Sequence, residues 1–507
     1  MKEEDYIMRK TIQQVENFGA IDAENDKNLL ENFYKAKVID ELVEVQKSIV
    51  IGRKGTGKSA IYTYICDEYK DEAVKLVFKD YPWQLHDRFK NELVSERERY
   101  VNSWEFLLYI EIAKKIITNK NNIWSKVERK EIKKLKKWLV RNWGSLDFNY
   151  KENLNPKGGK TIFNFAPQIM GNGLGSIAKE VATKDNVGSS LVEYNRKLDG
   201  IISKLLKSYN KNIILAFDQL DLAYSHKDFK YIEKLIGLLL TTYNFYQKYN
   251  NVKVIVFLRS DIFMNISFQD KNKIKDNLVE FLDWNAEDES GLSLKNLISK
   301  RIKNTLELED ERFDVCWKTV FSTNKIGKNQ FKWNYLIDRT FLRPRDIIKF
   351  MNLSLAQANK RLANNPEGEN IINNEDINNI KDKYSTYLYE ELKDEISGKY
   401  QDFEYYLEVL REIHLLTFTK EDFDEKYEKV KERYQLIETS DVVMERLYEF
   451  SIIGFYKPGG GGYGGSEYRF QYTSEYQKFN PNASKYKVHL GFKEYLELIE
   501  NRGTRIK

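Results

Sequence analysis

Short apolar runs alternate with helical patterns over the first 305 residues of the chain. The runs have the length of buried strands and lie at residues 49–51, 74–78, 213–217 and 252–258. Apolar residues at helical spacing lie between and after them, at residues 60–65, 100–117, 198–206, 229–247 and 292–302. Strands that alternate with helices favour a parallel sheet covered by helices. The pattern therefore predicts an α/β fold for this part of the chain.

The pattern changes towards both ends of the chain. Residues 306–398 have helical spacing throughout, whereas residues 399–507 hold short helices and then strand-like segments at 468–472 and 486–490, with a last helix at 492–499. Helices followed by a hairpin indicate a winged helix. The predicted domains are a lead-in with short helices at 5–17 and 27–34 over residues 1–47, a core over 48–305 with an irregular insertion near 120–195, a helical lid over 306–398 and a winged-helix-like domain over 399–507.

The strongest local motif follows the first predicted strand, in the stretch IVIGRKGTGKSAIY at residues 49–62. Its glycines, Lys58 and Ser59 have the spacing of a P-loop, in which backbone N–H groups surround a phosphate at the start of a helix. Lys58 is then expected to reach the outer phosphates and the Ser59 hydroxyl to ligate Mg²⁺. We therefore predict ATP and Mg²⁺ as ligands. The predicted binding residues are Gly52, Arg53, Lys54, Gly55, Thr56, Gly57, Lys58, Ser59 and Ala60.

Carboxylates follow the third apolar run, which ends in the sequence FDQLD. Asp218 is positioned at the carboxyl end of a buried strand, where it is expected to hold Mg²⁺ together with Ser59. The next residue, Gln219, cannot act as a base. Asp221 is the nearby carboxylate that could activate water, and a structural cap for the next helix is its alternative role.

Three arginines are candidate sensors of the γ-phosphate. Arg259 ends the run at 252–258, next to the predicted Asp218 strand, and pairing with Asp261 or Asp270 is its alternative role. Arg343 and Arg345 flank Pro344, which suits the first turn of a helix in the lid. From there an arginine can couple hydrolysis to lid movement, or it can be merely solvated or cap a neighbour. With Lys58, Asp218 and Asp221, these arginines complete the predicted catalytic set.

Residues 18–26, FGAIDAEND, precede the first strand of the predicted core. In many P-loop proteins this segment lies against the nucleotide base, so it is a candidate for adenine contact. A capping turn without a ligand explains the same residues equally well.

Two segments are candidate nucleic-acid surfaces. The predicted helix at residues 124–143 has an apolar stripe and a face rich in Lys and Arg, which is typical of contact with DNA, RNA or an acidic partner and also of a solvated helix. The C-terminal wing carries Lys457, Arg469, Lys478, Lys485 and Lys487, and it fits DNA contact and protein docking equally well.

Composition narrows the class of protein. The 507 residues are 41% hydrophobic, which is enough to bury about three domain cores. The 82 Lys and Arg nearly balance the 77 Asp and Glu, so any nucleic-acid surface is expected to be local. Two distant cysteines argue against a disulfide framework and favour a reducing compartment. The charged N-terminus is unlike a signal peptide and no apolar stretch is long enough to cross a membrane, so we expect a cytoplasmic protein without membrane contact.

With these motifs, the chain resembles a group of bacterial P-loop ATPases allied to the AAA+, STAND and KAP branches. The resemblance rests on FGAIDAEND, GRKGTGKSA, FDQLD, FLRSDIF and FLRPRDIIKF, which span residues 18–350. The order of elements also looks, more loosely, like that of origin-recognition initiator ATPases. The resemblance implies nucleotide binding at the P-loop, metal at Ser59 and Asp218, and sensor roles for Arg259 and for Arg343 or Arg345. It also implies an assembly switch, and relatives are often encoded in phage-defence or mobile-element neighbourhoods beside an effector such as a nuclease.

The leading hypothesis is an Mg²⁺-dependent ATPase that hydrolyses slowly, forms homo-oligomers and controls a partner such as a nuclease in antiviral defence. Gln219 departs from the AAA+ pattern, in which a glutamate activates water, and argues against fast turnover. The alternative hypothesis is a nucleotide-gated DNA-binding protein with little or no hydrolysis. A small-molecule kinase fits poorly, because such enzymes seldom have a chain of this length or a C-terminal wing.

Overall fold

The computed structural model describes residues 10–44, 47–78, 83–88, 95–147, 187–223, 229–284, 291–396, 399–459, 465–473 and 477–500. Two predicted features therefore lie outside the described residues. They are residues 148–186 of the predicted insertion, and residues 460–464 of the C-terminal glycine run.

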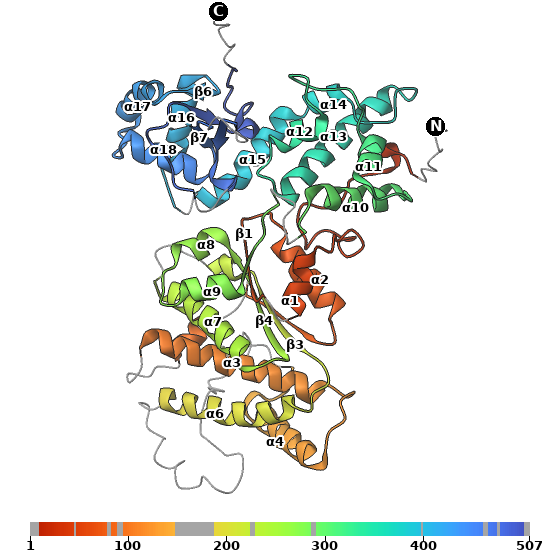
Figure 1. The fold of residues 1–507 in the computed structure, drawn as a ribbon, viewed down its shortest axis with the longest axis vertical. Coiled ribbons are helices and arrows are strands. Elements are labelled where there is room, and N and C mark those ends of the chain that lie inside the picture. Colours follow the sequence, from red (N-terminus) through yellow and green to blue (C-terminus); the bar gives the residue numbers. More distant parts are fainter. Residues whose placement is uncertain are drawn as a thin grey trace, which may run out of the picture.

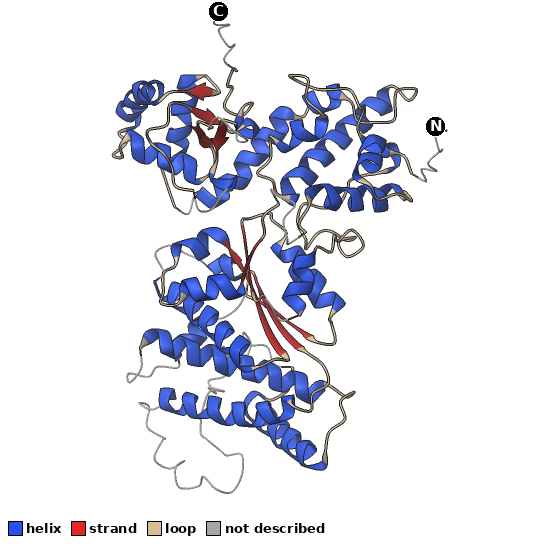
Figure 2. Ribbon diagram, in the orientation of Figure 1, coloured by secondary structure: helices blue, strands red, loops and turns tan. Residues whose placement is uncertain are grey.

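A parallel five-stranded sheet forms the centre of the core, as the sequence pattern predicts (Figures 1 and 2). The strand order is β2-β3-β4-β1-β5, so β4 pairs with both β1 and β3. Because parallel strands end at the same edge, the ends of β1, β3 and β4 bring their polar residues together. The short β5 was not predicted from the sequence. The strands are β1 (Ile49–Gly52), β2 (Ala73–Val77), β3 (Ile213–Asp218), β4 (Val252–Arg259) and β5 (Val279–Phe281).

Alternating side chains of the strands bury the two faces of the sheet under different helices. Val50 and Phe257 belong to a core shared with α1 (Lys37–Val43) and α2 (Lys58–Glu68). This core continues into the lid and the C-terminal region. Ile51 and Val256 belong to a second core on the opposite face. The helices of that second core are α3 (Glu96–Thr118), α4 (Lys126–Trp143), α6 (Val187–Leu206) and α7 (Phe229–Lys248), and Figure 1 shows α4 and α6 at the lower end of the molecule. Shorter elements are η2 (Trp83–Arg88), η4 (Leu220–Ala223), α8 (Ser260–Asn265) and α9 (Lys271–Leu278).

Helix α6 corrects the predicted extent of the irregular insertion. Residues 187–195 were expected to be irregular, but they form the first half of α6. Leu191, Leu198, Ile202 and Leu205 are buried and lie on one helical face against the second core. This stripe spans the boundary that the Gly-, Asn- and Lys-rich composition suggested, and its burial decides the structure.

The N-terminal segment is less helical than predicted. The predicted helix at 27–34 is not formed, because residues 27–32 make turns, and the described part of the helix predicted at 5–17 holds only η1 (Ile12–Gln14). Asp and Asn side chains compete with helical hydrogen bonds, and such short segments do not form stable helices alone.

Side-chain contacts fix this segment between the core and the lid. The Asn352 side chain accepts a hydrogen bond from the N–H of Phe18 and donates one to the carbonyl of Gly19, both at 2.9 Å. Arg301 donates to the carbonyl of Phe18 at 2.9 Å and forms an ion pair with Asp26 at 2.9 Å. We call residues 10–36 the strap.

The lid is helical, as predicted, but its first helix lies earlier in the chain than the sequence pattern indicates. Pro344 lies in the first turn of α13, as expected from its position. The helix predicted at 292–302 was assigned to the core, but α10 packs against α11 and α13 of the lid. The lid helices are α10 (Leu294–Leu306), α11 (Phe313–Val320), α12 (Lys332–Ile337), α13 (Pro344–Asn364), α14 (Asn374–Asn378) and α15 (Lys381–Ile396).

The C-terminal region combines helices with a four-stranded antiparallel sheet of order β6-β9-β7-β8 (Figure 2). The predicted combination of helices and strands is present, but the predicted hairpin is wrong, because β7 lies between β8 and β9 and pairs with both. The description of this region as a winged helix stays a prediction. The predicted last helix is not formed, because turns follow η6 (Leu490–Phe492). The other elements are α16 (Phe403–Ile413), β6 (Thr417–Phe418), α17 (Lys420–Tyr434), α18 (Ser440–Glu449), β7 (Ile453–Lys457), β8 (Glu467–Arg469), η5 (Gln471–Thr473) and β9 (Tyr486–Val488).

In the part of the chain that the structure describes, no helix has both the length and the apolar character needed to cross a membrane.

The buried pair of Arg301 and Asp26 yields a prediction about stability. Arg301→Met leaves the Asp26 carboxylate buried without its cation, so we expect a loss of about 3–5 kcal/mol in the free energy of unfolding. Arg312→Met is the matched control, because Arg312 pairs with Asp310 while its own side chain is 73% exposed, and we expect a change within about 0.5 kcal/mol. Thermal unfolding midpoints measure both, and equal midpoints for the two variants would contradict the prediction.

Candidate functional site

The loop between β1 and α2 has the backbone that a P-loop requires. Gly57 precedes α2 with φ +94°, a left-handed conformation that favours glycine. At Gly52, a Cβ atom would lie 2.4 Å from the Thr56 hydroxyl, so a larger residue does not fit. The loop therefore ends at the N-terminus of α2, where backbone N–H groups and the helix dipole favour an anion.

Lys58 lies in the first turn of α2 and points back over this loop. Its ammonium group donates to the carbonyls of Gly52 at 2.7 Å and Arg53 at 2.9 Å. Burial lowers the pKa of Lys58 to about 8, and the nearby carboxylates of Asp221 and Asp218 oppose that shift. The cation is thus held by neutral carbonyls in a site where an additional negative charge stabilises it.

Asp218 and Ser59 meet beside Lys58. Asp218 is 5% exposed and lies close to the Ser59 hydroxyl and the Gln219 N–H. Burial raises the pKa of Asp218 above its ordinary value, although these two groups and Lys58 lower it. Within the described residues, no group of three or more His, Cys, Asp or Glu could hold a metal. Asp218 and Ser59 would offer a metal one carboxylate and one hydroxyl oxygen. Oxygen ligands of this kind, with the rest from phosphate and water, suit Mg²⁺.

Two further carboxylates, Asp221 and Glu24, line the pocket. Asp221 belongs to η4, is 31% exposed and lies 3.8 Å from Arg259, and it does not cap α7, which begins eight residues later. Glu24 lies in the segment predicted to contact adenine, whereas its contact with Gln219 was not predicted. It accepts a hydrogen bond at 3.3 Å from the side chain of Gln219, which has φ +59°. No motif could have revealed this pair, because its members are 195 residues apart.

Arg259 pairs with Asp261, which is the alternative role considered for it, and its role as a phosphate sensor stays a prediction. Its guanidinium makes two 2.9 Å hydrogen bonds to the carboxylate of Asp261, and its side chain also lines the pocket. Burial lowers the pKa of Arg259, but Asp261 and the neighbouring acids outweigh this and hold it above its ordinary value.

Arg343 and Arg345 occupy different places. Arg343 is 2% exposed, makes a two-pronged contact with Asp346 at 2.9 Å and donates to the carbonyl of Lys54 at 2.9 Å. Arg345 lines the pocket and forms ion pairs at 2.9 Å with Asp22 of the strap and Glu391 of α15. Only Arg345 of the two therefore faces the space next to the P-loop.

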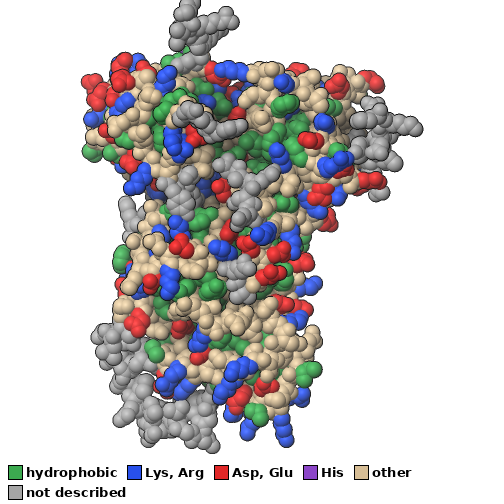
Figure 3. Space-filling model, viewed as in Figure 1, with side chains coloured by type: hydrophobic (Ala, Val, Ile, Leu, Met, Phe, Trp, Pro, Cys, Tyr) green, Lys and Arg blue, Asp and Glu red, His purple; other side chains and the backbone are tan. Residues whose placement is uncertain are grey.

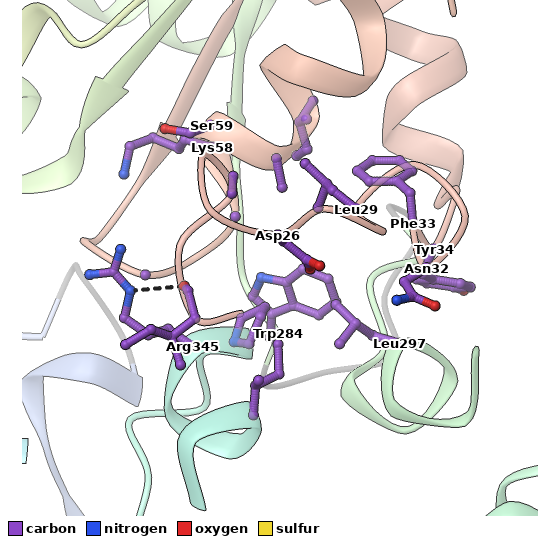
Figure 4. Close-up of a pocket in the computed structure, with 18 of the residues that line it drawn as sticks. Asp26, Leu29, Asn32, Phe33, Tyr34, Lys58, Ser59, Trp284, Leu297 and Arg345 are labelled. Atoms are coloured by element: carbon purple, nitrogen blue, oxygen red, sulfur yellow. Dashed lines mark hydrogen bonds between the residues drawn. The ribbon is translucent and has the colours of Figure 1, made fainter. Parts of the chain in front are cut away.

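One end of a pocket of about 290 Å³ is lined by the charged and polar side chains described above, namely Lys58, Ser59, Asp218, Asp221, Arg259 and Arg345. Figure 4 shows Lys58 and Ser59 at this end, Phe33 and Tyr34 at the other, and Trp284 and Leu297 between them. Phe33 is held by stacking on Tyr64, with ring centroids 4.1 Å apart. The pocket thus joins a charged end to an apolar end, which is the character that a nucleotide requires.

The predicted adenine segment contributes part of this lining. Ala20, Ile21, Ala23, Glu24 and Asp26 face the pocket, whereas Phe18 is fully buried and does not. The lining residues that were missed follow the segment or come from distant positions. They are Leu29, Asn32, Phe33, Tyr34, Ala36, Val38, Ile39, Trp284, Leu292, Leu297, Arg301 and Ile348.

Comparisons with known proteins give one family match, to a helical part of the chain, and a similarity to one curated protein. Residues 292–393 match the family model described as FunZ-associated C-terminal helical domain, which covers α10 to most of α15. The chain is 25% identical over 354 residues to a protein of Escherichia coli (strain K12) described as the transposon gamma-delta 80.3 kDa protein. That match covers 66% of this chain and 46% of the relative, so the chain spans about half the length of the curated relative it matches.

Two solved structures also overlap most of the chain. The Aeropyrum pernix ORC1 protein in complex with DNA has a TM-score of 0.30 at 9% identity, with 86% of this chain and 87% of that chain covered. Cdc6p from Pyrobaculum aerophilum has a TM-score of 0.27 at 13% identity, with 90% and 88% covered. Such scores carry no argument about function, and the fold class rests on the sheet and the P-loop themselves.

The two buried aspartates of the site differ in how well they are compensated, and this predicts opposite effects on stability. Asp218→Asn removes a charge that burial disfavours, so we expect the variant to be more stable by about 1 kcal/mol. Asp346→Asn breaks the two-pronged contact with Arg343 and is expected to lose about 3 kcal/mol. Thermal unfolding midpoints distinguish the two variants. A loss of stability in both would argue against an unfavourable buried charge at Asp218.

Proposed function

We propose that the chain is a slow Mg²⁺-dependent ATPase that switches the position of its lid and C-terminal region. The observation that carries this proposal is the convergence of Lys58, Ser59 and Asp218 at the N-terminus of α2, inside one pocket with an apolar end. The phosphates are held by the loop of residues 52–60, and Mg²⁺ by Ser59 and Asp218. Mg²⁺ supplies charge neutralisation of the phosphates and orients them.

Phe33, Trp284 and Leu297 are well placed to receive the base, because they are large apolar side chains that line the pocket. Arg259 and Arg345 act as phosphate sensors, whereas Arg343 acts indirectly by holding the carbonyl of Lys54. Asp221 or Glu24 orients the attacking water. The absence of a carboxylate at position 219 supports slow turnover, because an amide cannot accept a proton from water.

The proposal extends to what the switch controls. The resemblance of the motifs to defence-associated ATPases supports a cytoplasmic homo-oligomer that acts on an effector such as a nuclease in antiviral defence. The similarity to a transposon protein agrees with a mobile-element setting, in which such systems are common.

Phosphate release tests the enzymatic part of the proposal. Lys58→Ala removes the cation that reaches the outer phosphates, so we expect ATP affinity and phosphate release to fall at least about 100-fold. Asp218→Asn is expected to retain ATP binding and to lose Mg²⁺-dependent release, because it keeps the shape of the side chain but not its charge. Equal phosphate release by the wild type and by Lys58→Ala, with and without DNA, would exclude hydrolysis at this site.

Native mass measured with and without ATP and Mg²⁺ tests the assembly part separately. An ATP-dependent change of mass that is lost in Lys58→Ala supports a switch, and an unchanged mass argues against assembly controlled by the nucleotide.

A second candidate function is nucleotide-gated binding of DNA, and helix α4 favours it. This helix carries eight Lys and Arg and only two Glu. Glu128 caps the helix and Glu131 pairs with Lys134, which leaves a strongly positive face. Figure 3 shows Lys and Arg side chains at the lower end of the molecule, where Figure 1 places α4. The exposed basic residues are Lys126, Arg129, Lys130, Lys133, Lys134, Lys136, Lys137 and Arg141.

The C-terminal wing is the weaker of the two candidate DNA surfaces. Lys487 is only partly exposed and lies over the ring of Tyr468, and burial lowers its pKa. Arg469 bonds to Glu467 at 2.7 Å. Both side chains are therefore less available to a phosphate than the sequence suggests.

Charge reversal compares the two surfaces directly. Lys133→Glu/Lys137→Glu on α4 is expected to weaken binding of duplex DNA and to reduce the slope of log affinity against log salt by about 2. The matched variant Lys457→Glu/Lys485→Glu on the wing is expected to keep the wild-type slope. Fluorescence anisotropy at several salt concentrations measures both, and the opposite result would place DNA on the wing.

A further inference from the structure

Helix α15 presents two glutamates to the phosphate-binding cations. Glu391 and Glu395 are four residues apart and so lie on one face of the helix. Glu391 lies 2.9 Å from Arg345 and 3.5 Å from Lys54. Glu395 lies 3.9 Å from Arg259 and 4.0 Å from Arg343. One face of a lid helix therefore contacts the P-loop, the end of β4 and the start of α13.

The contacts of Glu395 are of a looser kind than those of the other acids at the site. Asp261 and Asp346 each make two 2.9 Å hydrogen bonds to their arginines. Glu395 is 11% exposed, approaches its two arginines only at ion-pair distance, and its Oε1 has no hydrogen-bond partner among the residues that the structure describes. A buried carboxylate held in this way is the partner that an arginine most readily exchanges.

The same helix is joined to the C-terminal region. The Ser385 hydroxyl donates to the carbonyl of Gly491 at 2.7 Å and accepts from the N–H of Tyr495 at 2.9 Å. Tyr389 stacks on Tyr495, with ring centroids 4.3 Å apart. A displacement of α15 is therefore transmitted to the C-terminal region, while the start of α13 stays bonded to the P-loop.

We propose that Glu391 and Glu395 form an acidic latch that a γ-phosphate displaces. This inference rests on the proposed ATP site and names its regulation. The γ-phosphate of a nucleoside triphosphate brings negative charge to Arg259 and Arg345, repels Glu395 and competes with both glutamates for their cations. A diphosphate lacks that group. The position of α15 then depends on whether the bound nucleotide is a triphosphate or a diphosphate, and by linkage the latch lowers affinity for the triphosphate.

Affinity for two nucleotides tests the latch. The probes are ADP and an ATP analogue with an imido group between the β- and γ-phosphorus atoms, each with Mg²⁺. In Glu391→Gln/Glu395→Gln we expect affinity for the analogue to rise by about fivefold or more. Affinity for ADP is expected to stay within about twofold of the wild type, as is every affinity of the control Glu390→Gln, which removes a charge from an exposed position of the same helix.

Glu395→Asp separates direct contact from general electrostatics. It keeps the charge but shortens the side chain by one methylene. The latch therefore predicts that selectivity for the triphosphate rises in this variant too, but by less than in the double variant. Wild-type selectivity in Glu395→Asp, or equal effects of the double variant on both nucleotides, would overturn the inference.

Hydrogen exchange of the wild type gives a readout that requires no variant. Faster exchange at residues 391–396 with the analogue than with ADP supports the latch, and identical exchange in the two complexes overturns it. Failure of the proposed function gives a different result. Wild-type protein that binds neither nucleotide, or binds both independently of Lys58, would overturn the ATP site and with it the latch.

Discussion

The pairing of β4 with both β1 and β3 is the constraint on which the site depends. In this register Gly52 lies opposite Arg259, and Phe217, the residue before Asp218, lies opposite Val256. Successive side chains in a strand point to opposite faces, so a slip of one residue would reverse every side chain of β4. The apolar residues of β4 belong to two different cores, which excludes such a slip. Packing beneath the sheet therefore fixes the positions of the charged groups at its edge.

The charged groups at this edge of the sheet lie close enough to pair with one another. Three arginines at the site each have a carboxylate partner from their own or a neighbouring element: Arg259 has Asp261, Arg343 has Asp346 and Arg345 has Asp22. Lys58 differs, because its ammonium group bonds to carbonyl oxygens and burial lowers its pKa. An anionic ligand is therefore stabilised chiefly by Lys58 and the N-terminus of α2, whereas the arginines must exchange one acid for another. Such exchange makes them suited to report on a ligand more than to hold it.

The sequence predicts the parts of the fold and site that depend on local pattern. Four strands, the P-loop and the Asp218 position are readable because an apolar run and a turn lie within a few residues of one another. The short β5 escapes because Glu280 interrupts its apolar run. The helix expected at 27–34 fails because Asp and Asn side chains compete with helical hydrogen bonds in so short a segment. The apolar lining of the pocket also escapes. Phe33, Trp284 and Leu297 meet only through tertiary packing, which no spacing along the chain encodes.

The backbone of the P-loop is itself part of the connection to the lid. Three successive carbonyls accept hydrogen bonds from outside the loop: Lys54 from the Arg343 side chain at 2.9 Å, Gly55 from the Arg345 N–H at 3.4 Å, and Thr56 from the Trp284 indole at 3.0 Å. Two of these donors belong to the first turn of α13 or its cap. When a phosphate draws the N–H groups of the loop towards itself, the opposite carbonyls move with them, because the peptide unit is rigid. The lid is thus coupled to the phosphate site through the backbone as well as through charge, and α13 and α15 receive that motion through different bonds.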